Sequence, residues 1–183
     1  MQGKLDTATF AGGCFWCFDA VFRHVKGVEK VASGFAGGEG DIDYNSIHYS
    51  PRGYAEAVQI TFDPDSVSYN DLLDIFWHLH DPTQLNRQGP DVGSEYRSVI
   101  FHHSDEQKEA AEKYKMTLDA SGEFSEPIVT DIKPFTTFVI ADEEHQNFYN
   151  KSKGSPYCLI MIDPKITKLK EKYYSKFEAQ KNL

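Results

Sequence analysis

Short apolar runs that end at glycine, proline or aspartate recur along the chain and predict its strands. The first run stops at Gly12-Gly13, and a later run is closed by Asp63-Pro64. Runs of this length between turn residues are typical of strands. We predict strands over residues 5–11, 28–35, 55–62 and 98–101, with two more near Ile128 and Phe138.

A second pattern, with apolar residues three and four positions apart, predicts the helices. It is clearest from Cys14 to the stop at Gly27, where the buried face consists of Phe15, Phe18, Val21, Phe22 and Val25. A serine followed three residues later by Asp or Gln marks two further helix starts, and a glycine ends the second of them. The remaining predicted helices cover 68–80, 104–121, a segment from about Asp142, and an amphipathic, charged tail over 164–179.

Strands and helices are interspersed without strict alternation, which favours an α+β fold over a regular parallel winding. We therefore expect a mixed sheet with helices packed on it, in a single domain over residues 1–183, because no repeat or linker divides the chain. Residues 81–96 form a long polar loop. Loops of this kind carry function more often than core packing.

Composition and charge narrow the possible partners. The chain has 183 residues, a formal net charge of −9 and 14% aromatic residues. A basic face binds phosphate backbones or anionic lipids, and none is visible, so we expect neither nucleic acid nor a membrane as partner. No leader peptide or membrane span is apparent. Three cysteines are too few for a disulfide framework, which predicts a reducing, cytoplasmic setting with one or two working thiols.

The strongest chemical signal lies where the first predicted strand runs into a helix, in Gly12-Gly13-Cys14-Phe15-Trp16-Cys17. The free N–H groups and the dipole at a helix start favour thiolate, so we predict a lowered pKa and a nucleophilic role for Cys14. Phe15 and Trp16 are expected to wall an apolar pocket beside the sulfur. A buried structural cysteine would explain one of these features but not their combination.

Cys14 and Cys17 also form a C-x-x-C pair, which leaves two other interpretations open. One is a general thiol–disulfide oxidoreductase that uses this pair. The other is a zinc or peptide-binding module, in which Cys158 and a histidine would complete the site because no second C-x-x-C exists. The histidines add little support, since His78 and His80 do not share a helix face. We expect no metal and no cofactor.

One carboxyl group stands apart from the other acidic residues. Glu56 begins a predicted strand of apolar residues, and burial there raises the pKa of a carboxyl group so that it can act as an acid. Tyr44, Asp91 and Tyr96 lie in loop-like segments near strand ends, where by themselves they would pass as ordinary residues.

Together these residues resemble a known family. Gly13-Cys14-Phe15-Trp16 is similar to the signature of the peptide methionine sulfoxide reductase A family, and Tyr44 precedes Glu56 in a Gly-x-Ala-Glu context as it does there. Two later blocks also match, consisting of Leu85-Asn86-Arg87-Gln88-Gly89 with Asp91 and Tyr96-Arg97-Ser98, and of His145-Gln146 with Tyr157-Cys158. The resemblance runs from Phe10 to Cys158 and implies a two-layer sandwich with a ferredoxin-like core.

The resemblance also implies a reaction. An enzyme of this family repairs oxidised proteins by reducing the S epimer of methionine sulfoxide, protein-bound or free, through a sulfenic acid on Cys14. Phe15 and Trp16 then hold the substrate methyl group, and protonated Glu56 hydrogen-bonds the sulfoxide oxygen. Tyr44 and Tyr96 are implied to form a polar pocket for that oxygen. Asp91 is implied to fix the loop and the substrate backbone, and His145 to form a neighbouring wall.

By the same resemblance, a second thiol forms a disulfide with Cys14, and thioredoxin restores both thiols. Cys158 matches the family's resolving cysteine and follows the flexible sequence Lys153-Gly154-Ser155-Pro156, so we prefer it. Cys17 is the alternative, although we expect it to point into the core. We expect the enzyme to be a monomer.

Three residues depart from the family pattern. Asp19 replaces the usual glutamate of the signature, which is expected to shorten or remove a contact beside the site. Tyr54 replaces the histidine of Gly-His-Ala-Glu, and Phe148 replaces an aromatic residue that is often tyrosine, which removes a hydroxyl group. None of the three has an implied role in the chemical step.

Overall fold

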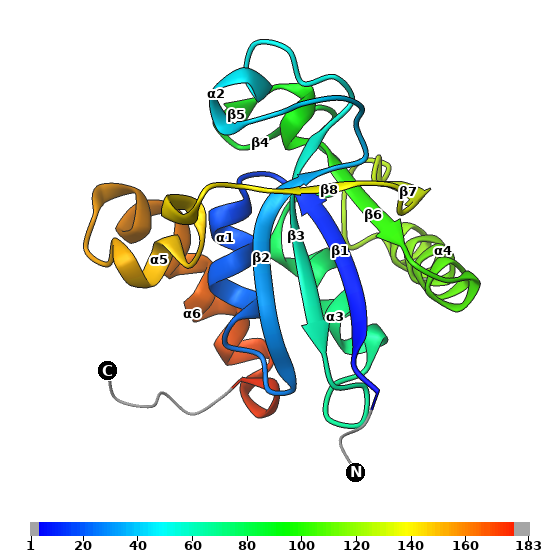
Figure 1. The fold of residues 1–183 in the computed structure, drawn as a ribbon. Helices are drawn as coiled ribbons and strands as arrows, with labels where there is room; N and C mark the ends of the chain where they lie inside the picture. The colour runs from blue at the N-terminus through cyan, green and yellow to red at the C-terminus, as the bar shows by residue number, and fades with distance from the viewer. Residues whose placement is uncertain (1–3, 178–183) are drawn as a thin grey trace.

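A six-stranded mixed sheet organises the computed structural model, which describes residues 4–177 (Figure 1). The strand order is β7-β6-β1-β3-β2-β8, in which β7 runs parallel to β6 and the other neighbours are antiparallel. The expected α+β fold with a mixed sheet is confirmed. The strands are β1 Asp6–Gly12, β2 Val28–Ala36, β3 Ala55–Phe62, β6 Ser98–His102, β7 Asp131–Pro134 and β8 Phe138–Ile140, and a separate hairpin joins β4 Arg87–Gln88 to β5 Asp91–Val92.

Helices pack on one face of this sheet (Figure 1). Helix α1 contacts β2 and β3, and α6 lies beside both α1 and α3, while α4 packs against α3 and β6. Two short helices, α2 and α5, follow β2 and β8 in the chain. The helices are α1 Phe15–Phe22, α2 Tyr44–Ile47, α3 Tyr69–Leu79, α4 Asp105–Ser121, α5 Phe148–Lys151 and α6 Asp163–Lys172.

Aromatic side chains fill the layer between the sheet and its helices. The ring centroid of Phe10 on β1 lies 4.9 Å from that of Phe76 on α3 and 5.8 Å from that of Phe22 on α1. All three side chains are fully buried. Removal of such large apolar surfaces from water is the main stabilising contribution, and it fixes α1 against the sheet.

The predicted helix signals occur where the sequence places them. Ser68 caps α3 by accepting a hydrogen bond from the backbone N–H of Asp71, whose side chain accepts one from the Ser68 backbone in return. Ser104 caps α4 by accepting a hydrogen bond from the backbone N–H of Gln107, and Gly122 ends that helix in a left-handed conformation with φ +73°. The expected glycine stop is therefore confirmed, because glycine adopts this conformation without a steric penalty.

Several boundaries differ from the prediction. Helix α1 ends at Phe22 and not at Gly27, and the chain then turns toward β2. The Arg23 side chain donates a hydrogen bond to the carbonyl oxygen of Val31 on β2. The strand expected near Ile128 is β7, which pairs with β6 from Asp131 onward. The segment from 142 holds a turn over Glu143–His145 and then α5, and the tail helix α6 ends at Lys172. The predicted end of that tail at 179 lies outside the described residues.

Two helical segments and the structure of the long loop were not predicted. The loop over 81–96 contains the β4–β5 hairpin and the turn Ser94–Tyr96, and α2 follows β2 after the loop over 37–43. A π-helical turn spans Cys158–Ile162 and runs into α6. Over residues 4–177, every helix is too short or too polar to cross a membrane.

Candidate active site

Cys14 lies at the turn between β1 and α1, immediately before the first residue of the helix. Its neighbour Gly13 has φ +116°, a conformation that favours glycine. A Cβ atom at this position would lie 2.8 Å from Cγ of Gln88 on β4. The glycine therefore allows the β4–β5 hairpin to pack directly against the turn that carries the thiol.

The Cys14 thiol lies in a less polar environment than its place at a helix start suggests. Burial raises its pKa well above the ordinary value, and the nearby Glu56 and Cys17 groups raise the pKa further. The Tyr157 hydroxyl and the backbone of Trp16 lower it, with smaller effect. The predicted lowering of the Cys14 pKa is therefore wrong, because the loss of water around the sulfur outweighs the helix N-terminus.

Glu56 of β3 is a buried carboxyl group that is hydrogen-bonded to this turn. It is 1% exposed, and its Oε2 accepts a hydrogen bond of 3.2 Å from the backbone N–H of Phe15. Burial raises the pKa of Glu56 to about 8, and Asp91 and Glu95 add to the rise, although the Phe15 hydrogen bond opposes it. The predicted raised pKa is confirmed, and a pKa of about 8 leaves the carboxyl group largely protonated at neutral pH.

Trp16 is the centre of an aromatic wall beside Cys14. Its ring stacks on Phe148 of α5 with 3.8 Å between centroids and 8° between planes. Tyr157 meets it edge-on at 5.3 Å, and His145 stacks on it at 5.8 Å. The wall combines residues that are far apart in sequence, which explains why its shape could not be read from the Cys14 motif alone.

Three predicted polar residues face the same site. Figure 1 shows α2, which begins at Tyr44, and the β4–β5 hairpin, which holds Asp91, at the end of the sheet where α1 starts. Burial raises the pKa of Tyr44 and Tyr96, and the nearby Glu56 and Cys14 groups raise both further. Burial also raises the pKa of Asp91. These residues are therefore grouped around the thiol, as the sequence motifs predicted.

His145 completes this group from the turn after β8. Its ring stacks on Tyr44 with 4.0 Å between centroids, and it is buried. Burial lowers its pKa, which Glu144 and Asp142 partly offset. A histidine in this state is neutral and forms a packing surface between Tyr44 and Trp16.

The other two thiols are both buried, and all three cysteines are free. Cys17 faces inward from α1; burial raises its pKa, while Lys165 and the Tyr157 hydroxyl lower it. Cys158 lies in the π-helical turn and is fully buried. Cys158 and Ile162 of this turn pack into the main core, whereas Lys153, Gly154 and Pro156 in the preceding segment are exposed.

The departures from the family pattern have structural explanations. Asp19 is fully buried and binds Arg23 through two hydrogen bonds of 2.7 and 2.9 Å, and it accepts a third from the Ser33 hydroxyl at 3.2 Å. Asp19 therefore ties α1 to β2. The Tyr54 hydroxyl donates to the carbonyl oxygen of Gly40 at 2.9 Å. Phe148 uses its ring against Trp16, which needs no hydroxyl.

Sequence reasoning missed a pair of residues next to the predicted tyrosines. His48 Nδ1 lies 3.3 Å from Oε1 of Glu95 and 3.4 Å from the hydroxyl of Tyr96. Both residues lie near the tyrosines of the family motif, since Glu95 precedes Tyr96 and His48 stands four residues after Tyr44. Residues four apart lie on the same face of a helix, so a predicted α2 would have placed His48 beside Tyr44.

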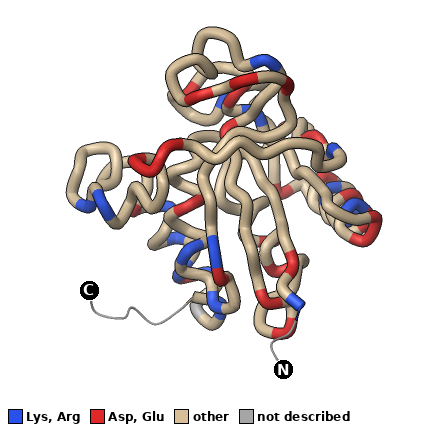
Figure 2. Tube along the Cα trace, in the orientation of Figure 1, with Lys and Arg blue, Asp and Glu red and all other residues tan. Residues whose placement is uncertain are grey.

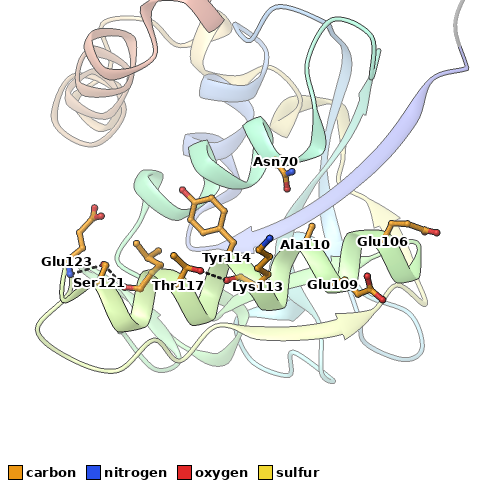
Figure 3. A pocket seen from close by; sticks show the side chains of 10 residues that line it. Asn70, Glu106, Glu109, Ala110, Lys113, Tyr114, Thr117, Ser121 and Glu123 are labelled. Atoms are coloured by element: carbon orange, nitrogen blue, oxygen red, sulfur yellow. Dashed lines mark hydrogen bonds between the residues drawn. The ribbon is translucent and has the colours of Figure 1, made fainter.

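Charged residues and one groove mark other parts of the structure around this site. Figure 2 shows acidic residues around α2 and the β4–β5 hairpin, and basic residues along α6. A groove of about 670 Å³ lies elsewhere along α4 and is lined by residues such as Asn70, Tyr114 and Glu123 (Figure 3). Within the described part of the chain, no three His, Cys, Asp or Glu side chains are grouped to hold a metal ion.

Comparison with known proteins gives consistent matches. The family model of peptide methionine sulfoxide reductase matches residues 6–178. The chain is 47% identical to the peptide methionine sulfoxide reductase MsrA of Natronomonas pharaonis over 95% of its own length and 98% of the relative. Reduced Mxr1 from Saccharomyces cerevisiae is similar in structure, with a TM-score of 0.76 and 30% identity over 82% of this chain and 87% of Mxr1. Mxr1 in complex with Trx2 matches with a TM-score of 0.55 and 25% identity over 79% and 85% of the two chains.

Proposed function

The chain belongs to the peptide methionine sulfoxide reductase family, and we propose that it reduces the S epimer of methionine sulfoxide through a sulfenic acid on Cys14. Family membership makes it a methionine sulfoxide reductase that repairs oxidised methionine. The proposal extends to both protein-bound and free substrate, and to a monomer in which residues 1–183 form one domain.

In the proposed step the deprotonated Cys14 sulfur attacks the sulfoxide sulfur, and the oxygen is transferred to Cys14. The bond between the substrate sulfur and oxygen breaks, methionine leaves, and Cys14 is oxidised to sulfenic acid as the sulfoxide is reduced by two electrons. Glu56 gives its proton to the oxygen, and the proton lost from the Cys14 thiol replaces it. The step therefore needs no net proton.

The observation that carries the proposal is the buried, protonated carboxyl group of Glu56 beside the Cys14 turn. A pKa of about 8 keeps this proton available at neutral pH. The hydroxyl groups of Tyr44 and Tyr96 are suited to donate hydrogen bonds to the same oxygen as negative charge develops on it. Phe15 and Trp16 are proposed to hold the substrate methyl group, and Phe148 supports this apolar wall by stacking on Trp16.

We propose Cys158 as the thiol that resolves the sulfenic acid, with release of water as the disulfide with Cys14 forms. Its neighbour Tyr157 already lies edge-on to Trp16. Cys158 is buried, so the π-helical turn must open first, and such turns are frequent at functional sites. Thioredoxin is the proposed reductant, in keeping with the solved complex of Mxr1 with Trx2.

The experiment that tests the function is turnover of the separated S and R epimers of a methionine sulfoxide peptide with dithiothreitol. We expect wild type to reduce only the S epimer and Cys14→Ser to reduce neither. Failure of folded, reduced wild type on both epimers would overturn the proposal. A thiol–disulfide oxidoreductase that uses Cys14 and Cys17 would instead need Cys17 and would tolerate Glu56→Gln.

A further inference from the structure

We infer that His48 is a positioning residue that sets the direction of the Tyr96 hydroxyl proton, with Glu95 holding the imidazole in place. The inference rests on the proposed function, in which that hydroxyl donates to the sulfoxide oxygen. His48 acts through Tyr96 and has no contact of its own with the reacting atoms.

His48 occupies the space between the two tyrosines of the polar pocket. Its ring meets the Tyr44 ring edge-on, with 5.0 Å between the centroids. The His48 and Tyr96 rings are stacked, with 6.1 Å between their centroids and 25° between their planes. A single nitrogen, Nδ1, faces both Oε1 of Glu95 at 3.3 Å and the Tyr96 hydroxyl at 3.4 Å. Movement of this ring would therefore affect both tyrosines.

The Glu95 carboxylate is placed for this contact by the backbone before it. Gly93 has φ +151°, and a Cβ atom there would collide with the Glu95 carboxylate oxygens. Glu95 is itself buried, and among residues 4–177 its side chain has one hydrogen-bond partner, His48. The missing side chain at Gly93 thus allows an acidic group to be held against the His48 ring.

The chemistry of these groups determines where the protons lie. A carboxylate offers only acceptors, so the proton between Glu95 and His48 belongs to Nδ1. The same N–H then faces the Tyr96 oxygen, which accepts from it. With that lone pair occupied, the Tyr96 proton is directed away from His48. Besides burial, which has the largest effect, Glu56 and Cys14 are near enough to raise the pKa of Tyr96.

A double-mutant cycle tests this role. His48→Phe keeps an aromatic ring but loses Nδ1, and we expect kcat for the S epimer to fall roughly five- to tenfold, the effect of one lost hydrogen bond, with a smaller change in KM. His48→Asn retains an N–H donor near Nδ1 and should recover most of the loss. In a Tyr96→Phe background, His48→Phe should change kcat by less than about twofold, because the hydroxyl it orients is gone.

The controls separate this inference from the proposed function. His102→Phe, at the end of β6, should leave kcat unchanged, and thermal unfolding of each variant checks that it is folded. Equal losses for His48→Phe with and without the Tyr96 hydroxyl would overturn the inference, as would no loss, or no recovery in His48→Asn. Inactive wild type, or active Cys14→Ser, would instead contradict the proposed function.

Discussion

The backbone N–H of Phe15 donates a 3.2 Å hydrogen bond to Oε2 of Glu56, which joins the start of α1 to β3. This contact brings a buried carboxyl group to the residue next to the proposed nucleophile. A hydrogen bond of this kind favours the charged carboxylate, yet burial dominates and the pKa of Glu56 is about 8. The fold therefore maintains a proton where the proposed reaction uses one.

Glu56→Gln should lower activity and raise stability at neutral pH. The folded-state pKa of about 8 lies above the ordinary value of 4.5, so the folded protein holds an extra proton between these two pH values. The contribution of Glu56 to the free energy of unfolding is greatest below about pH 4.5. As pH rises from there to about 8, the free energy of unfolding falls by up to about 1.4 kcal/mol per pH unit, and above about pH 8 this group causes no further change. Urea unfolding of wild type and variant across this range measures the difference. Equal slopes in both proteins would contradict the buried acid.

The rate of sulfenic acid formation should rise with pH up to about 8 and then level off, because the reactive state of Cys14 thiolate and protonated Glu56 forms when the pair loses one proton. No decline is expected near pH 8, since the pKa of Cys14 is raised well above its ordinary value. Glu95→Gln removes a negative charge that raises the Glu56 pKa, so the plateau should begin at a lower pH in the variant. Single-turnover kinetics with the S epimer, from about pH 6 to about pH 10, measure both profiles. A plateau that begins at the same pH in the two proteins would contradict the charge interaction.

Phe148→Ala should raise KM several-fold with less effect on kcat, because it removes the ring that stacks on Trp16 at 3.8 Å. Phe148→Tyr keeps the ring and should bind substrate as wild type does. Phe135 makes a similar stack, with His103 at 4.2 Å, away from the site, so Phe135→Ala is the matched control. If Phe135→Ala raised KM equally, the aromatic wall would have no specific role.

Arg23→Leu should destabilise the protein by about 3 kcal/mol, because it leaves the buried Asp19 carboxylate without its charged partner. Replacing both residues, with Asp19→Asn and Arg23→Leu, should recover part of that loss, since no unpaired charge remains. Urea unfolding measures the stability of each variant. A loss in the double variant as large as that in Arg23→Leu would show that packing, and not charge, explains it.

The disulfide that forms after one turnover should join Cys14 to Cys158. Cys158→Ser should then accumulate sulfenic acid, while Cys17→Ser should form the same disulfide as wild type. Peptide mapping by mass spectrometry after reaction with one equivalent of the S epimer distinguishes these outcomes. A Cys14–Cys17 disulfide in wild type would identify Cys17 as the resolving thiol.

Much of the fold could be predicted because local patterns specify it. The cap at Ser68 and the left-handed stop at Gly122 occur as predicted, since both depend on neighbouring residues alone. The raised pKa of Glu56 was predictable for a similar reason, because its strand neighbours are apolar. Helix α1 ends at Phe22, before the glycine stop that the pattern predicted, and Arg23 beyond it binds Val31 on β2, a contact that no local pattern contains.

By itself, the sequence determined the α+β class, the order of the main strands and helices, and the motif residues that meet at one end of the sheet. Only the tertiary structure decided the pKa of Cys14, the aromatic wall and the His48–Glu95 pair. Desolvation and stacking depend on segments as distant in the chain as β3, α5 and Tyr157, which become neighbours only when the core forms. The helix start favours thiolate locally, but the assembled walls exclude water, and that collective effect is larger.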